Sequence, residues 1–388
     1  MGAKLAGRAG GFNVGLLNIQ QDRSQTSDST NLTVARISRN VLEESTLGFI
    51  ATHGDPLSGD KNALGGADFN YRNSELIENR VVAGNLWYQN TFSGDDDYDH
   101  SEKAWGARIV YPNDRINWQV AYRELDDEFD PALGFVNRRN IRRIDGSWRH
   151  RHHPAAGRVR TVDSKVTTLA VYDRVDDALE GWNVIFTPAK VTTHYDDSIS
   201  LDLIQIFDKV EQPFFIVPHV GLRRGKYTAP SALLRIATSP NRPLRFNLTV
   251  RGGGFYDGQV IRVNPFVEWR PSEHFLFSFE WNDRWWLNYR GHNQVDGAPT
   301  ETTRQVDFLT RTARLRVVIN FTPDASWSTV NQYDNFSNQI SAQSIFRWII
   351  EEGNDVYLVL GQTLDATPHA PRVGRNEPIA RVSWTYRF

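Results

Sequence analysis

Apolar and polar residues alternate along most of this chain. Between Leu244 and Arg251, apolar side chains occupy every second position, and Arg, Asn, Thr and Arg fill the positions between them. The same alternation returns in 116–123, 261–270, 275–284 and 312–321. Because successive side chains of a β-strand point to opposite faces, this period predicts strands with one apolar and one polar face. Windows with helical spacing are almost absent, so we predict an all-β fold.

The composition of the polar face narrows the fold further. Its residues are mainly Arg, Asn, Gln, Ser and Glu, whereas a strand facing bulk water usually carries Lys, Glu and Thr. Such a face is typical of side chains enclosed in a wide, water-filled barrel, and the aromatic residues near strand ends suit interfacial girdles. We therefore predict a large antiparallel transmembrane β-barrel of about 20 or more strands. Two of the expected strands, Ala3–Ala9 and Lys190–Lys209, have weak patterns.

The connections between strands alternate in length. Short turns are expected at 112–114, 239–243, 271–274 and 322–326. Long polar loops are expected at 21–30, 91–102, 124–138, 290–303 and 365–376. Two connections on the long-loop side, 256–259 and 334–338, are nevertheless short. This asymmetry is typical of an outer-membrane barrel, in which the short turns are periplasmic.

Charge and composition exclude several classes of protein. The 388 residues include 44 Lys+Arg, of which seven are Lys, against 46 Asp+Glu, and this balance argues against a nucleic-acid partner. The mean hydropathy is −0.49, and no apolar run of about 18 residues is present, so helical membrane spans are excluded while barrel strands are not. The absence of Cys excludes disulfides and thiolate sites. No cofactor is expected.

We interpret residues 1–388 as a single barrel domain. The N-terminal residues have no long apolar segment, so we expect that they are not a signal peptide. About 21 strands are counted, whereas bacterial single-chain barrels have even strand numbers. We therefore expect that N-terminal strands precede Met1 in a longer protein.

Several segments spread along the chain resemble a known family. They are Gly2–Arg8, Gly10–Asn18, Gly134–Arg138, Gly253–Gly258, Asn331–Asn335 and Phe346–Ile349. Together they resemble a family of uncharacterised bacterial outer-membrane proteins, in which a barrel domain of unknown function follows a module similar to carbohydrate-binding family 9. The resemblance implies that this chain corresponds to the C-terminal barrel portion, and that the Gly2–Arg8 segment follows further strands. It implies no catalytic residues.

Charged residues on the polar faces are the candidate pore lining. They are Arg245, Arg251, Arg262, Glu268, Arg270, Glu280, Arg284, Arg314, Arg316, Arg347 and Arg381. A ring of fixed cations would select anionic or polyhydroxylated solutes. Alternatively, the arginines pair with Glu268, Glu280 and Asp283 and stiffen the barrel, which we favour because acidic residues are interleaved on the same strands. Asp283 falls on the Trp281 face, so it is a candidate rim residue.

The C-terminus carries a second candidate signal. Trp384, Tyr386 and Phe388 stand at alternate positions up to the last residue. This arrangement resembles the terminal signal that the bacterial barrel-assembly machinery reads. The alternative is an ordinary final strand that ends in an aromatic residue.

Three further groups have ordinary explanations that we prefer. Asp95, Asp96, Asp97 and Asp99 offer oxygen ligands for calcium, but a solvated acidic loop is the commoner meaning. His150 and His152 have a chelating spacing, but the neighbouring Arg149 and Arg151 oppose a metal, so a basic turn is preferred. A catalytic pair at the rim could be drawn from His53, His100, His292, His369, Ser58, Ser93 and Asp296, but such a set arises by chance in polar loops.

The sequence therefore predicts a bacterial outer-membrane barrel that acts as a pore or transport element for small solutes, carbohydrate or anionic. The alternative is a surface or secretion-linked scaffold, or a barrel-based hydrolase, without a conducting pore. A soluble propeller would show blade-length repeats, and none is found. The expected partners are outer-membrane lipid, the barrel-assembly machinery and, since wide barrels are usually filled, a plug or partner subunit.

Overall fold

The computed structural model describes residues 1–23, 29–57, 61–94, 100–217, 220–295, 298–366 and 372–383, without the side chains of 290–304, 372, 373, 375 and 376. This part of the chain is all β. Twenty-one strands form one large antiparallel sheet, and two short strands form a separate hairpin. No helix within these ranges is long and apolar enough to cross a membrane. The contacts divide the chain into two compact units, which are described separately.

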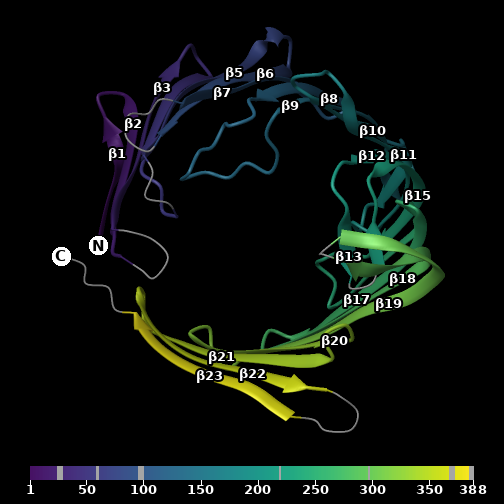
Figure 1. The fold of residues 1–388 in the computed structure, drawn as a ribbon. Coiled ribbons are helices and arrows are strands. Elements are labelled where there is room, and N and C mark those ends of the chain that lie inside the picture. The colour runs from purple at the N-terminus through teal and green to yellow at the C-terminus, as the bar shows by residue number, and fades with distance from the viewer. Residues whose placement is uncertain are drawn as a thin grey trace. The chain divides into compact units, whose positions relative to one another are not determined.

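Unit 1 comprises residues 1–151, 164–185 and 206–209. Its first nine strands are β1 (Gly2–Ala9), β2 (Phe12–Gln21), β3 (Thr30–Val41), β4 (Ser45–His53), β5 (Lys61–Ile77), β6 (Arg80–Gly94), β7 (His100–Pro112), β8 (Ile116–Leu125) and β9 (Ile141–His152). Each of β1 to β8 pairs antiparallel with the next strand in sequence (Figure 1). The weakly patterned strand at Ala3–Ala9 is confirmed as β1.

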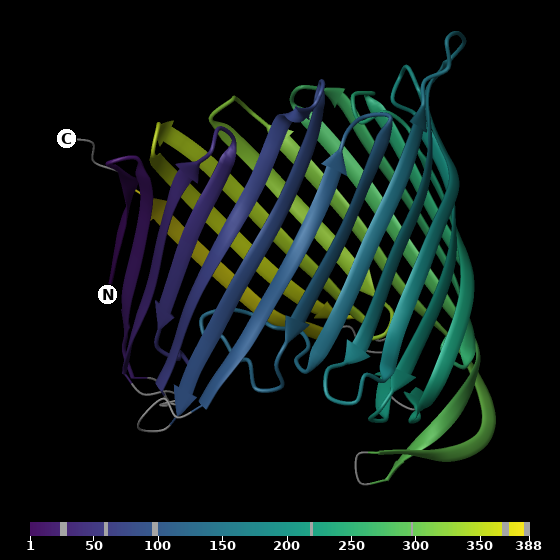
Figure 2. The ribbon, with the colours of Figure 1, turned by 90° about the horizontal axis from the view of Figure 1, so that it is seen from above.

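Unit 2 comprises residues 152–163, 186–205 and 210–388. Its consecutive antiparallel strands are β15 (Gly225–Ala237), β16 (Leu244–Phe255), β17 (Gly258–Ser272), β18 (Phe275–Val295), β19 (Ala298–Asn320), β20 (Ala325–Asp334), β21 (Gln339–Glu351), β22 (Asn354–Asp365) and β23 (Arg372–Ser383) (Figure 2). The separate hairpin consists of β13 (Phe214–Val217) and β14 (Val220–Leu222).

Besides β9, whose last residue belongs to unit 2, three strands are divided between the two units. They are β10 (Val159–Asp173), β11 (Leu179–Thr193) and β12 (Ser198–Val210). The expectation of one strand over Lys190–Lys209 is wrong, because a turn at 194–197 separates β11 from β12. Asp196 in that turn has a φ of 65°, a left-handed conformation that Asp tolerates in tight turns.

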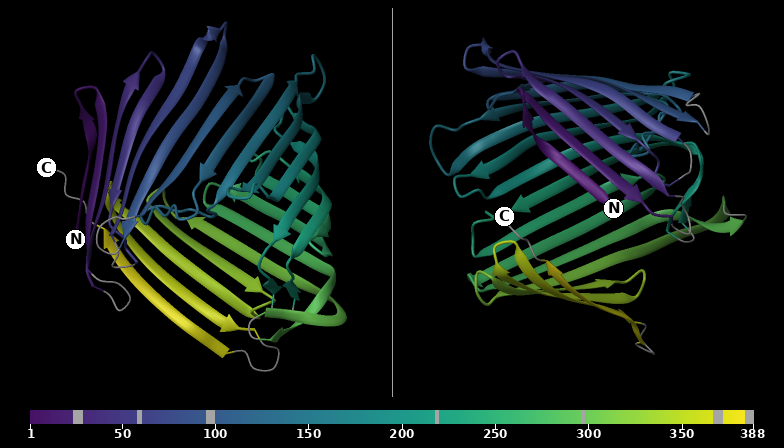
Figure 3. Two further views of the ribbon diagram at one scale, coloured as in Figure 1. Left: turned by 45° about the horizontal axis from the view of Figure 1, so that its top comes forward. Right: turned by 90° about the vertical axis from the view of Figure 1, so that its left-hand side faces the viewer.

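The alternation of connections holds in unit 1 and fails in unit 2, where connections on the expected long-loop side are as short as the turns on the other side. In unit 1, short turns such as 42–44 and 78–79 alternate with longer connections such as 126–140 (Figure 3). The two exceptions near 256 and 336 are also short. The expected long loop at 290–303 is wrong, because β18 and β19 keep pairing as far as Val295 and Ala298. The side-chain alternation has ended there, but backbone pairing continues, because the hydrogen bonds between two strands involve only their peptide groups.

The apolar faces of the strands are exposed. In unit 1, Phe49, Leu86, Ile109 and Val120 share the same face through consecutive pairings, and each is 51–55% exposed. In unit 2, Phe279 and Leu315 are directly opposite each other and are 42% and 43% exposed. These side chains therefore do not lie between two layers of sheet, as they would in a soluble sandwich. A large exposed apolar surface is typical of contact with lipid.

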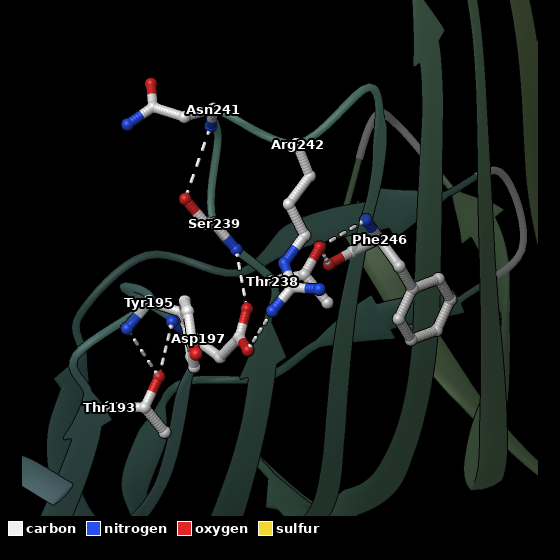
Figure 4. A network of polar contacts seen from close by, with 8 residues as sticks. All are labelled: Thr193, Tyr195, Asp197, Thr238, Ser239, Asn241, Arg242 and Phe246. Carbon is white, nitrogen blue, oxygen red and sulfur yellow. Dashed lines mark hydrogen bonds and ion pairs between the residues drawn. The ribbon is translucent and has the colours of Figure 1, made fainter. Parts of the chain in front are cut away.

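Neighbouring short turns of unit 2 are joined by a network around Asp197 (Figure 4). Its carboxylate accepts a hydrogen bond from the backbone N–H of Ser239 at 2.9 Å and pairs with the guanidinium of Arg242. Within its own turn, the hydroxyl of Thr193 accepts hydrogen bonds from the backbone N–H groups of Tyr195 and Asp197. The turn after β11 is thereby fixed to the turn after β15.

Candidate functional site

The predicted pore-lining residues of unit 2 share one face of the sheet. In the observed register Arg245 is opposite Glu268, Arg251 is opposite Arg262, and Glu280 is opposite Arg314. The remaining members fall on the same face by the two-residue period of their strands: Arg270, Arg284, Arg316, Arg347 and Arg381. We call this the polar face of unit 2. The placement agrees with the predicted pore lining, whose role stays a prediction.

Part of the polar face is neutralised by ion pairs. Arg270 lies 2.7 Å from Glu268, and Arg347 lies 3.2 Å from Asp355. Arg314 lies 3.7 Å from Glu280 and also donates to the side-chain oxygen of Gln332 at 2.9 Å. Each of these arginines therefore has a carboxylate within reach, and its stiffening of the barrel stays a prediction.

Asp283 does not belong to this polar face. It lies 4% exposed on the apolar face of β18, directly opposite Arg311, which donates two hydrogen bonds to its carboxylate at 2.7 and 2.8 Å. The guanidinium of Arg311 also lies 4.7 Å from the ring centroid of Trp281. The pairing of Asp283 with the polar-face arginines is therefore wrong. The pairing period itself places Asp283 and Arg311 on the apolar side.

Three arginines form a row across three adjacent strands. Arg251 of β16 is opposite Arg262 of β17, which is opposite Arg284 of β18. Among the described residues no carboxylate pairs with any of the three. Instead, Arg251 donates to the hydroxyl of Ser231 at 3.1 Å and Arg262 donates to Asn282 at 3.1 Å. Like charges placed directly opposite destabilise a sheet, so this row favours an anion beside it.

The row retains unused hydrogen-bonding capacity. The Nε–H of Arg251 is buried without a partner in the described structure. Arg284 lies with its guanidinium 5.3 Å from the ring centroid of Trp286, a contact that occupies its face and not its N–H donors. A guanidinium offers five donors in a fixed plane that matches carboxylate and phosphate oxygens. The row can therefore bind an oxyanion without rearrangement of the sheet.

The hairpin of β13 and β14 covers one end of the polar face in unit 2. Val220 and Tyr289 are 2% and 0% exposed in an apolar cluster that also contains Val260 and Trp286. The Tyr289 hydroxyl donates to the carbonyl of Phe255 at 2.8 Å. Sequence analysis missed this hairpin because its strands are too short for an alternating pattern. The apolar run Phe214–Val217 was the available signal.

In unit 1, the connection 126–140 between β8 and β9 lies on the polar face of the sheet (Figure 1). We call it the inner segment. Asn62 of β5 holds it through two hydrogen bonds, donating to the carbonyl of Asp130 at 2.8 Å and accepting from the N–H of Ala132 at 3.2 Å. Phe129 is 2% exposed in a cluster with Leu64 and Ala104. These contacts fix the segment against the sheet.

Ion pairs and backbone hydrogen bonds complete the anchoring of the inner segment. Arg138 pairs with the buried carboxylate of Glu180, and the backbone N–H of Asp126 donates to the carbonyl of Lys103 at 3.0 Å. Arg139 lies 2.7 Å from Asp130 within the segment. Sequence analysis predicted only a polar loop here. The apolar residues within it, such as Phe129, were the signal that it packs against something.

The other candidates remain separate or lie outside the described residues. His150 stacks on Trp148 with centroids 6.2 Å apart, and His100 lies 3.9 Å from Glu128. In the described ranges no group of three His, Cys, Asp or Glu could hold a metal. Several candidates lie outside the described residues: the acidic loop Asp95–Asp99, the predicted terminal signal (Trp384, Tyr386, Phe388), Ser58, Asp296, His369 and the side chain of His292.

Comparison with solved structures identifies the fold. The siderophore receptor PirA of Pseudomonas aeruginosa matches with a TM-score of 0.54 and 9% identity, over 96% of this chain and 73% of that receptor. The ferric enterobactin receptor PfeA of the same organism, as a mutant in complex with enterobactin, matches with a TM-score of 0.56 and 8% identity, over 95% and 72% of the two chains. No protein-family model and no curated protein matches the sequence. The chain therefore has the fold of the large antiparallel transmembrane β-barrels of the outer membrane.

Proposed function

We propose that this protein lies in the bacterial outer membrane and lets small anionic solutes cross it. The observation that carries the proposal is the row of Arg251, Arg262 and Arg284, which share a polar face without a neutralising carboxylate among the described residues. The exposed apolar face supports the membrane location, and a likeness of fold to receptors for siderophores is compatible with transport. Lipid and the barrel-assembly machinery are the proposed partners.

The size of the expected selectivity follows from elementary electrostatics. A monovalent anion about 4 Å from one guanidinium gains about 1 kcal/mol in water, which corresponds to roughly fivefold enrichment. Three neighbouring cations raise this further, and salt at physiological strength screens interactions beyond about 8 Å. A pore with this row should therefore prefer anions clearly, and the preference should fall at high salt.

Current recordings in planar lipid bilayers test the proposal. In a KCl gradient, we expect discrete conductance steps and a reversal potential on the anion-selective side. The triple substitution of Arg251, Arg262 and Arg284 to Gln should move the reversal potential toward that of a non-selective pore. The matched control is Arg39→Gln, because Arg39 lies on the apolar face of unit 1, over the ring of Phe12. Equal shifts in both variants would contradict the assignment of the row.

A non-conducting scaffold is the second candidate. The observation that favours it is that the inner segment and the hairpin of β13 and β14 each cover part of a polar face. If both segments fill the barrel, ions will not pass. A folded, heat-modifiable protein that gives no current steps in bilayers would select this candidate.

A further inference from the structure

A cavity of about 600 Å³ lies between the inner segment and the polar face of unit 1. Residues of β4, β5, β6, β8, β9 and β10 form its floor, and the inner segment forms its cover. This volume is within the range of sites that bind small molecules. The cavity is separate from the arginine row, which belongs to unit 2.

One part of the cavity lining is apolar and includes three aromatic residues, Trp87, Phe129 and Phe135. Trp87 and Leu125 line it from the sheet, and Leu133 and Phe135 line it from the inner segment. Phe135 is 87% exposed, although the neighbouring Phe129 is fully packed. An aromatic side chain left uncovered at the lining of a cavity is suited to contact the ring of a ligand.

The charged part of the lining is exclusively cationic. Arg123, Arg138 and Arg143 line the cavity, and no Asp or Glu is among its lining residues. Just outside it, Arg123 and Arg143 share one oxygen of Asp145 at 3.5 and 3.1 Å, and Arg138 pairs with Glu180. Three guanidiniums against two carboxylates leave one positive charge. The Arg123 side chain, which is 43% exposed, can offer donors to a ligand.

The cavity is held in shape without a ligand. Both hydrogen bonds of Asn62, the burial of Phe129 and the ion pair of Arg138 fix the cover to the sheet. A site that is already ordered loses little conformational entropy when a ligand binds. We therefore propose that this cavity binds a small organic monoanion that combines a carboxylate with an apolar ring, with the carboxylate at Arg123 and the ring against Phe135.

This inference deepens the proposed function. It rests on that function only where it treats the bound anion as a transported solute. Binding itself is measurable without conduction. The probe is radiolabelled benzoate in equilibrium dialysis against the full chain in lipid nanodiscs, with empty nanodiscs subtracted. Acetate, which has the charge without the ring, and benzyl alcohol, which has the ring without the charge, serve as competitors.

We expect saturable binding of benzoate that neither competitor displaces at equal concentration. Arg123→Gln should weaken it at least tenfold, because the charge excess disappears, and Phe135→Ser should weaken it several-fold. Phe135 is exposed, so that variant should fold even if the Arg123 variant does not. Arg39→Gln, on the opposite face of the same unit, should bind like the wild type.

Three results would overturn the inference. They are the absence of saturable benzoate binding above empty nanodiscs, acetate competing as well as benzoate itself, and equal losses in the Arg39 and Phe135 variants. A protein that binds benzoate but gives no bilayer current would refute the proposed function and leave the site intact. A protein that conducts anions in bilayers but shows no saturable benzoate binding would refute the binding site and leave the proposed function intact.

Discussion

The ion pair of Asp283 and Arg311 gives a sharp test of the assignment of faces. We expect Asp283→Asn to destabilise the barrel, because it leaves the Arg311 cation without its counter-charge on the apolar face. The double variant Asp283→Leu with Arg311→Met removes the cation as well. If the face contacts lipid, the double variant should therefore be more stable than the single one.

The expected magnitude follows from the burial of the two partners. Removing one partner of a fully buried pair costs about 3–5 kcal/mol. Here the Asp283 side chain is only 6% exposed, but that of Arg311 is 33% exposed. Arg311 also lies beside the turn after β20, where its carbonyl accepts a hydrogen bond from the N–H of Asn335 at 3.1 Å. A cation near the edge of a membrane barrel costs less than one at mid-depth, so we expect a loss of about 2 kcal/mol.

Urea unfolding in lipid vesicles, followed by tryptophan fluorescence, measures these free energies. The double variant should lie within about 1 kcal/mol of the wild type. Glu268→Gln is the control, since it disrupts a pair with the half-exposed Arg270 on the polar face and should cost less than about 1 kcal/mol. A single variant as stable as the wild type, or a double variant less stable than the single one, would refute the reasoning.

Three further predictions concern single contacts. Gly258→Ala places a Cβ 2.5 Å from the Tyr289 ring and should destabilise the β13–β14 cluster by about 1–3 kcal/mol. Proteolysis at this hairpin should become faster, and an unchanged rate would contradict the tight packing of the ring. Asn62→Ala removes two hydrogen bonds of about 1 kcal/mol each and should speed tryptic cleavage at Arg138. The heat-modifiable gel shift should stay the same, and an unchanged cleavage rate would contradict the anchoring of the inner segment by Asn62. Asp197→Asn weakens an exposed ion pair and should lower the free energy of unfolding by less than about 1 kcal/mol. A larger loss in a urea titration would contradict this and would show that the network around Asp197 contributes more to stability than an exposed ion pair does.

The two faces of the strands could be predicted because they depend only on a period of two. Each strand from 244 to 321 carries its exposed apolar residues where the alternation places them. The length of β18 and β19 could not be predicted in this way, because their pairing continues past Arg290, with one shift in register, as far as Val295 and Ala298, where the alternation has ended. The alternation of apolar and polar residues therefore predicts which side chains share a face better than it predicts where a strand ends.

The arginine row depends on register, which the sequence leaves open. The tight turn after β16 brings Arg251 opposite Arg262. Arg262 meets Arg284 only because the pairing of β17 with β18 shifts by one residue between Trp269 and Ser272. Without this irregularity Arg284 would have a different neighbour, since a slip of one residue exchanges the faces. The candidate residues were therefore predictable as a set, and their arrangement was not.

The inner segment has a consequence for the order in which the protein folds. Its anchors lie far from it in sequence: Asn62 precedes Asp130 by 68 residues, and Glu180 follows Arg138 by 42. Contacts between distant residues form late, because the chain entropy lost in closing a long loop is recovered only when the flanking structure exists. The strands that supply Asn62 and Glu180 must therefore be in place before the cover settles. In a newly folded chain the polar face of unit 1 would be uncovered at first, and the inner segment would close over it in a later step.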